Sequence, residues 1–114
     1  MDNCLFCKII AGDIPSTKVY ENDLVYAFRD INPQAPTHIL VIPKTHVASM
    51  AAIDEVSDEI LVACLRACRE IALQEGLGEN GFRIVTNAGP DACQSVHHLH
   101  FHILGGKQMA DSMA

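Results

Sequence analysis

The sequence predicts an α+β domain in which one long helix covers an antiparallel sheet of five strands and a second, short helix lies near the N-terminus. Three observations lead to this prediction. Apolar residues recur at helical spacing over residues 54–75 and, more briefly, over residues 4–11. Short runs of strand-forming residues lie before and after the long helix. The connections within each group of strands are short, which favours antiparallel pairing.

The five expected strands are short runs of β-branched, aliphatic or aromatic residues bounded by turn-forming residues: 18–21, 24–29, 37–43, 82–86 and a histidine-rich run within 94–106. Asn22-Asp23 can form a hairpin turn between the first two strands. The third strand has a continuous apolar run, as expected for a central strand that is covered on both faces. His38, at its start, is interpreted as a structural hydrogen-bonding residue.

The long helix expected at residues 54–75 has recognisable ends. Asp54 or Ser57 can cap its start, and Gly76 follows its end. Its apolar residues form one stripe at helical spacing: Ile60, Cys64, Cys68, Ile71 and Ala72. Because both cysteines lie within this stripe, they are interpreted as core residues and not as metal ligands.

The short helix expected at residues 4–11 follows Asn3, which can cap it, and ends before Gly12. Cys4 and Cys7 are three residues apart and therefore share one helix face. Two interpretations are open for these thiols. They are either small core residues or two of the four ligands of a tetrahedral zinc site. A zinc site would need two further ligands from elsewhere in the chain.

The most unusual segment contains His98, His100 and His102 in alternation with apolar residues. A period of two predicts a strand with the three imidazoles on one face and the apolar side chains on the other. Three interpretations are open: a solvent-exposed face, a metal site, or nucleophilic and acid–base chemistry on a phosphate. The spacing alone does not separate the last two.

Composition limits the class of protein. The 114 residues suffice for one domain, taken as 1–114, and an apolar fraction of 49% argues against disorder. A formal net charge of −6 disfavours binding to nucleic acid or to an anionic membrane, although a small anionic ligand remains possible. Neither a signal peptide nor a membrane-spanning run is recognised, so a cytoplasmic location is expected. The five cysteines are then expected to be thiols or metal ligands.

The run from His98 to Leu104 has the alternating pattern that names the histidine-triad (HIT) superfamily. Four further segments resemble its Hint branch: 12–15, 30–38, 40–44 and 105–109. The resemblance extends over nearly the whole chain. It implies a homodimeric α+β protein that binds a purine nucleotide such as AMP or GMP. It also implies hydrolysis of nucleoside phosphoramidates or aminoacyl-adenylates to the nucleoside monophosphate, without an organic cofactor.

The same resemblance implies roles for individual residues. His100 is the expected nucleophile, which forms a nucleotidyl-histidine intermediate, and His98 and His102 are expected to stabilise the phosphate oxygens. Ser95 is expected to help protonate the leaving amine. The residues expected to contact the nucleotide are Asp30 at the ribose, Asn87, Ser95 and Val96 at the phosphate, and Phe6, Ile9, Phe28 and Ile31 around the base.

Zinc is implied by a further part of the resemblance. In family members with an N-terminal Cys-x-x-Cys pair, a histidine near the triad and the first triad histidine can complete a zinc site. The corresponding ligands here are Cys4, Cys7, His46 and His98, a donor set that suits a closed structural site. Because the Hint branch often lacks the cysteines, the alternative of two buried thiols stays open.

Two other functions also stay open. One is a nucleotide-binding regulatory protein with little turnover, and the other is a HIT-type dinucleotide hydrolase or nucleotidyl transferase. Each of these functions needs a site that binds the nucleotide. Only a catalytic function also needs His100 to be free to attack phosphorus. The chain also lacks the longer tail that Hint proteins often carry after the segment ending at Met109, so the resemblance does not fix the substrate.

Overall fold

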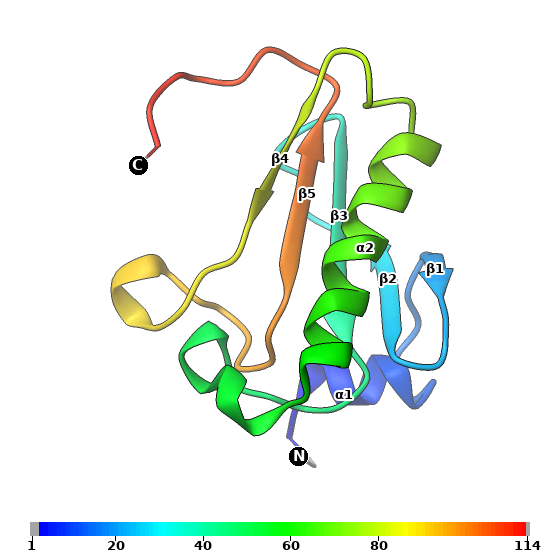
Figure 1. Ribbon diagram of the computed structural model, residues 1–114, viewed down its shortest axis with the longest axis vertical. Coiled ribbons are helices and arrows are strands. Elements are labelled where there is room, and N and C mark those ends of the chain that lie inside the picture. The colour runs from blue at the N-terminus through cyan, green and yellow to red at the C-terminus, as the bar shows by residue number, and fades with distance from the viewer. Residues whose placement is uncertain (1–2, 114) are drawn as a thin grey trace.

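A computed structural model describes residues 3–113 (Figure 1). The elements in chain order are α1 (Leu5–Ile10), β1 (Lys18–Glu21), β2 (Val25–Arg29), β3 (Thr37–Pro43), the 3₁₀ helix η1 (Met50–Glu55), α2 (Asp58–Gln74), β4 (Phe82–Val85), the 3₁₀ helix η2 (Pro90–Ala92) and β5 (Phe101–Gly105). The strands form one sheet in the order β1-β2-β3-β5-β4, and every neighbouring pair is antiparallel. The predicted fold class is therefore confirmed.

Two helix starts differ from the prediction. The long helix does not begin at residue 54, which lies within η1. Of the two caps that the sequence offered, Ser57 is the correct one, since its hydroxyl accepts the N–H of Ile60 at the start of α2. The short helix is capped by Cys4 and not by Asn3, since the Cys4 sulfur accepts the N–H of Cys7. The capping group of α1 is thus one of the candidate metal ligands.

The main core lies between α2 and one face of the sheet. Its sheet residues come from β2, β3 and the segment that includes β5: Val25, Ala27, Ile39, Val41, Leu99, Phe101 and Ile103. The inner face of α2 supplies the helix residues: Cys64, Ala67, Cys68, Ile71 and Ala72. Burial raises the pKa of the Cys64 and Cys68 thiols to about 12, so both stay protonated within the core. Their interpretation as core residues is confirmed.

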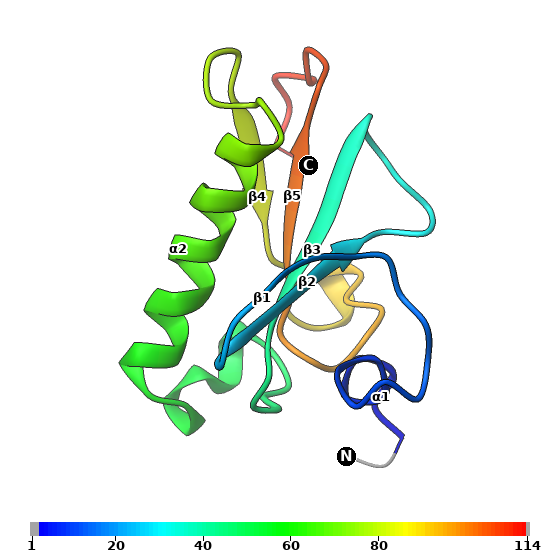
Figure 2. The same cartoon turned by 90° about the vertical axis from the view of Figure 1, so that its right-hand side faces the viewer.

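The opposite face of the sheet carries α1 (Figure 2). A smaller apolar cluster joins this short helix to β2 and β3: Phe6, Ile9, Tyr26, Phe28, Leu40 and Ile42. A helix of 6 residues covers only part of a five-stranded sheet, so this face has room for a site beside it. No helix within residues 3–113 has the length and apolar character needed to span a membrane.

The histidine segment, residues 98–103, contributes side chains to both faces of the sheet. β5 begins at Phe101. The sequence predicted that His98, Leu99 and His100 belong to this strand, but they precede it and are not paired in the sheet. The alternation nevertheless continues through this segment, because the N–H of Leu99 donates to the carbonyl oxygen of Val47 and the Leu99 side chain enters the core. The three triad imidazoles lie on the α1 face, as the period of two predicts.

Candidate active site

A cleft of about 350 Å³ opens on the α1 face of the sheet. Its lining includes seven of the eight residues that the sequence predicts to contact a nucleotide: Phe6, Ile9, Phe28, Asp30, Ile31, Ser95 and Val96. His100 and His102 line it as well. The lining therefore combines apolar walls with a carboxylate, a hydroxyl and two imidazoles, which suits a ligand with one flat apolar part and one polar part.

Asn87 is the eighth predicted residue, and the structure does not bring it into this lining. It is half-buried in the loop that follows β4. Ile31 lies at the opposite extreme, since it lines the cleft and is 99% exposed. An apolar side chain so exposed gains burial when an apolar group occupies the cleft, which is consistent with a place beside the base of a nucleotide.

His100 offers a lone pair to the cleft. Its Nδ1–H donates to the backbone carbonyl oxygen of His98 over 2.7 Å. A neutral imidazole has one N–H, so Nε2 carries the lone pair. The Phe6 ring stands perpendicular to the imidazole at a centroid distance of 5.1 Å and restricts its orientation. Burial lowers the pKa of His100, which favours this neutral form.

His102 offers the opposite group, a hydrogen-bond donor. The N–H of Gln34 donates to Nδ1 of His38 over 3.0 Å, so His38 carries its proton on Nε2. Nε2 of His38 lies 2.8 Å from Nδ1 of His102 and 3.4 Å from a carboxylate oxygen of Asp30. Because Nδ1 of His102 accepts from His38, its own proton is on Nε2. The cleft thus receives a lone pair from His100 and an N–H from His102.

His98 does not line the cleft, and its imidazole lies beside the start of α1. It is fully buried, and its Nε2–H donates to the carbonyl oxygen of Pro43 over 2.8 Å. Nδ1 therefore carries the lone pair. Burial, together with the nearby His46 and His100, lowers the pKa of His98 to about 4. A neutral imidazole with a fixed lone pair is the form that binds a metal ion.

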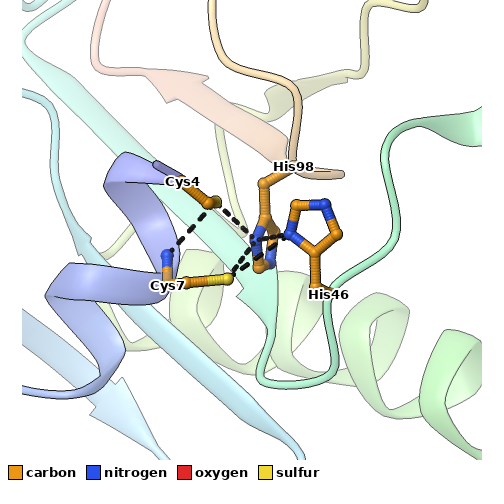
Figure 3. A group of neighbouring side chains, drawn as sticks. All are labelled: Cys4, Cys7, His46 and His98. Carbon is orange, nitrogen blue, oxygen red and sulfur yellow. Dashed lines mark hydrogen bonds between the residues drawn. The ribbon is translucent and has the colours of Figure 1, made fainter. Parts of the chain in front are cut away.

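The lone pair of His98 faces the three other predicted zinc ligands (Figure 3). Cys4 and Cys7 come from the start of α1, and His46 comes from the loop after β3. Nδ1 of His98 lies 3.4 Å from the Cys4 sulfur, 3.6 Å from the Cys7 sulfur and 3.2 Å from Nδ1 of His46. The Cys7 sulfur lies 3.4 Å from Nδ1 of His46.

These separations fit a tetrahedral zinc ion. With zinc–nitrogen bonds of about 2.0 Å and zinc–sulfur bonds of about 2.3 Å, neighbouring donor atoms in a tetrahedron stand roughly 3.3–3.8 Å apart. All four donor atoms lie within 4.8 Å of one another. Burial and the adjacent Cys4 side chain raise the pKa of the Cys7 thiol to about 11 in the absence of a metal ion. The donor set and its spacing therefore suit a closed structural site.

Sequence reasoning did not assign a site role to two residues that position the site. His38 fixes the proton of His102, as described above, although its hydrogen-bonding character was predicted. Gln94 holds the loop that carries Ser95, because its side chain accepts from the N–H of Gly89 and donates to the carbonyl oxygens of Ala48 and Val96. The partners of Gln94 are backbone atoms up to 46 residues away, so no local pattern marks it.

Comparisons with known proteins identify a family for this chain. The HIT domain family model matches residues 11–109. A "14 kDa zinc-binding protein" of Zea mays is 55% identical over 92% of this chain and 83% of its own length. "Adenylylsulfatase HINT1" of Arabidopsis thaliana is 51% identical over 92% of this chain and 72% of its own length. "Purine nucleoside phosphoramidase" of Escherichia coli is 41% identical over 99% of this chain and 95% of its own length.

Solved structures show the same fold. A HIT family hydrolase from Clostridium thermocellum superposes with a TM-score of 0.92 and 43% sequence identity, covering 100% of this chain and 99% of that one. The residues that match the family model, 11–109, include all five strands of the sheet and the alternating triad. The chain therefore belongs to the HIT domain family.

Proposed function

We propose that this protein is a hydrolase that cleaves purine nucleoside phosphoramidates or aminoacyl-adenylates and releases the nucleoside monophosphate. The observation that carries the proposal is the state of His100. Its Nδ1–H is held by the carbonyl oxygen of His98, which leaves Nε2 unprotonated in the cleft. The names of the Escherichia coli relative and of the Clostridium thermocellum structure support a hydrolase of this kind.

The proposed reaction has two steps. In the first, Nε2 of His100 attacks the α-phosphorus, a phosphorus–nitrogen bond to the histidine forms, and the bond to the leaving group breaks. Ser95, which lines the cleft, is the residue proposed to help protonate a leaving amine. In the second step water attacks the phosphorus, the histidine is released, and the nucleoside monophosphate leaves.

The neighbours of His100 support this chemistry in different ways. The Nε2–H of His102 can donate to a phosphate oxygen, where charge increases in the transition state. Asp30 can accept from the ribose hydroxyls, and the apolar side chains around Phe28 can hold the base. Zinc bound to Cys4, Cys7, His46 and His98 would tie α1 to the loop before η1 and to the triad, a structural contribution.

Incubation with adenosine 5′-phosphoramidate tests the proposal. Catalytic release of AMP, with many turnovers per chain, is the expected result. Nucleotide binding without release would instead favour the regulatory alternative. Efficient cleavage of a dinucleotide in preference to the phosphoramidate would favour the dinucleotide hydrolase. Adenylyl sulfate belongs in the same assay, because the Arabidopsis thaliana relative is named for it.

The protein is also proposed to act as a homodimer. Five apolar side chains are exposed on the α2 side of the molecule: Val62, Leu65, Leu73, Phe82 and Ile84. Ile84 on β4 pairs with Ile103, whose side chain lies beneath α2, so Ile84 and Phe82 share that face of the sheet. The helix packs mainly over β3 and β2 and leaves this end of the sheet open (Figure 1). A second copy would cover the apolar patch and the free edge of β4.

Light scattering at micromolar concentration is expected to give twice the 12.4 kDa mass of one chain. Leu65→Glu should shift the protein to the monomer, because Leu65 is 56% exposed and its replacement places a charge within the proposed interface without disturbing the core. Thr45→Glu, an exposed position on another part of the surface, is the matched control. A wild-type protein that is monomeric under these conditions would contradict the dimer.

A further inference from the structure

The four proposed zinc ligands complete a coordination shell, but they are not sealed from solvent. A second cavity, of about 480 Å³, opens beside them and is lined by Cys4 and His46. Cys7 lines neither this cavity nor the cleft that contains His100. The two sulfur atoms of the site therefore differ in access, because a small solute that enters the second cavity meets Cys4 and not Cys7.

The sulfur atoms of Cys4 and Cys7 also lie close to each other. All four candidate donor atoms are within 4.8 Å of one another, and the two cysteine side chains point towards the same space (Figure 3). A disulfide bond is about 2.05 Å long, so the two sulfur atoms would have to approach each other by less than about 3 Å. Cys4 precedes α1 and has an extended backbone, so its side chain can move without unwinding the helix.

The other three cysteines lack this combination of access and proximity. Cys64 and Cys68 lie in the core under α2, where burial keeps both thiols protonated. Cys93 is exposed but lies outside the ligand group. Because the thiolate is the nucleophilic form of cysteine and zinc binds that form, Cys4 and Cys7 are the pair prepared for reaction with an electrophile.

We propose that Cys4 and Cys7 form an oxidation site, at which a hydroperoxide such as hydrogen peroxide converts the two sulfur ligands into a disulfide bond and the site loses its zinc. Cys4 reacts first because it lines the second cavity, and Cys7 completes the disulfide. This inference rests on the proposed zinc site and does not depend on the identity of the nucleotide substrate.

The reaction balances as a two-electron oxidation. The Cys4 sulfur attacks one oxygen of hydrogen peroxide, the oxygen–oxygen bond breaks, and a sulfenic acid and hydroxide form. The Cys7 sulfur then attacks the Cys4 sulfur, the sulfur–oxygen bond breaks, and a second hydroxide leaves. Two protons from solvent convert the hydroxides into water. Two thiolates are oxidised, one peroxide is reduced, and two imidazoles remain of the four zinc donors.

Oxidation at this site also reaches the nucleotide cleft through α1. Phe6, two residues after Cys4, lines the cleft, and its ring stands 5.1 Å from that of His100 and 5.9 Å from that of His98, between ring centroids. The Cys4 sulfur caps the same helix by accepting the N–H of Cys7. Loss of zinc and of this cap therefore loosens one wall of the cleft, which places the proposed nucleotide site under the influence of peroxide.

Peroxide treatment of zinc-loaded Cys93→Ser protein tests the proposal, because this variant lacks the exposed thiol and keeps all four ligands. A chromogenic chelator is expected to detect release of close to one zinc per chain, against little release from a sample without peroxide. Peptide mass spectrometry should find one disulfide, between Cys4 and Cys7. Dithiothreitol with added zinc should reverse both changes, and the wild type should release the same amount of zinc.

Limited alkylation of the same zinc-loaded protein with iodoacetamide tests which sulfur is accessible. Among chains that carry one alkyl group, Cys4 should carry it about tenfold more often than Cys7. Equal or preferential modification of Cys7 would overturn the role of Cys4. Zinc that stays bound in peroxide, or a disulfide between other cysteines, would overturn the oxidation site. Untreated protein without zinc would overturn the zinc site itself, and elemental analysis distinguishes that result from a loaded protein that resists oxidation.

Discussion

His100→Ala is expected to abolish phosphoramidate turnover while it leaves nucleotide affinity within about tenfold of the wild type, or about 1.4 kcal/mol. The reason is the division of roles within the cleft. Only Nε2 of His100 is held unprotonated by a backbone acceptor and lines the cleft, so the variant loses the attacking atom. The apolar side chains around the base, the Asp30 carboxylate and the His102 donor remain. Loss of a nucleophile costs roughly a thousandfold or more in kcat, about 4 kcal/mol.

Turnover of adenosine 5′-phosphoramidate and binding of AMP are measured on the same preparations, and thermal melting checks that each variant is folded. A loss of binding as large as the loss of turnover would identify His100 as a structural residue. A fully active His100→Ala would end its assignment as nucleophile. His100→Gly provides a further test, because added imidazole can occupy the space left by the ring and restore part of the turnover.

The covalent intermediate can be trapped independently. A phosphorus–nitrogen adduct is stable to base and labile to acid, so rapid quenching without acid should preserve it. The adduct is expected on His100. An adduct on His102 would keep the two-step mechanism but transfer the nucleophile to the neighbouring histidine, and the donor role inferred from the contact between His102 and His38 would then be wrong.

The sequence predicted which side chains share a face better than it predicted where strands begin. Alternation places His98, His100 and His102 on one face because the period of two is a property of local backbone geometry. The start of β5 at Phe101 depends on its partners: Phe101 pairs with Val41 of β3, and residues 94–100 of the same segment have no register partner in β3 or β4. Pairing is a long-range property, so the predicted strand included residues that precede it.

The tautomers of the triad lie beyond what a sequence pattern can predict. Each is set by an acceptor or a donor on the backbone, such as the Pro43 carbonyl oxygen for His98 and the Gln34 N–H acting through His38 for His102. Pro43 lies 55 residues before His98, and His38, through which the Gln34 N–H acts, lies 64 residues before His102. A residue type can be matched to a family position, but the direction of a carbonyl group is known only once the chain is folded.

Cys4→Ser is expected to abolish zinc binding and to lower the Tm by roughly 10 °C or more, about 2–3 kcal/mol for a domain of this size. Cys4 has two roles, since its sulfur caps α1 and also faces Nδ1 of His98. Serine is itself a good helix cap, so this substitution retains the capping role and removes the ligand. The loss of stability then reports the metal site, because a structural zinc ion contributes its binding free energy to folding.

Elemental analysis of protein purified with reduced thiols is expected to give close to one zinc per chain for the wild type and less than about a tenth for Cys4→Ser. Cys93→Ser is the matched control, because Cys93 is an exposed thiol outside the ligand group and its replacement should leave both the zinc content and the Tm unchanged. A chelator should lower the Tm of the wild type towards that of Cys4→Ser and leave the variant itself unaffected. Nucleotide affinity should fall less than stability, since neither cysteine lines the cleft beside His100. Wild-type protein with less than about a tenth of an equivalent of zinc would contradict the site and identify the four residues as a metal-free hydrogen-bonded cluster.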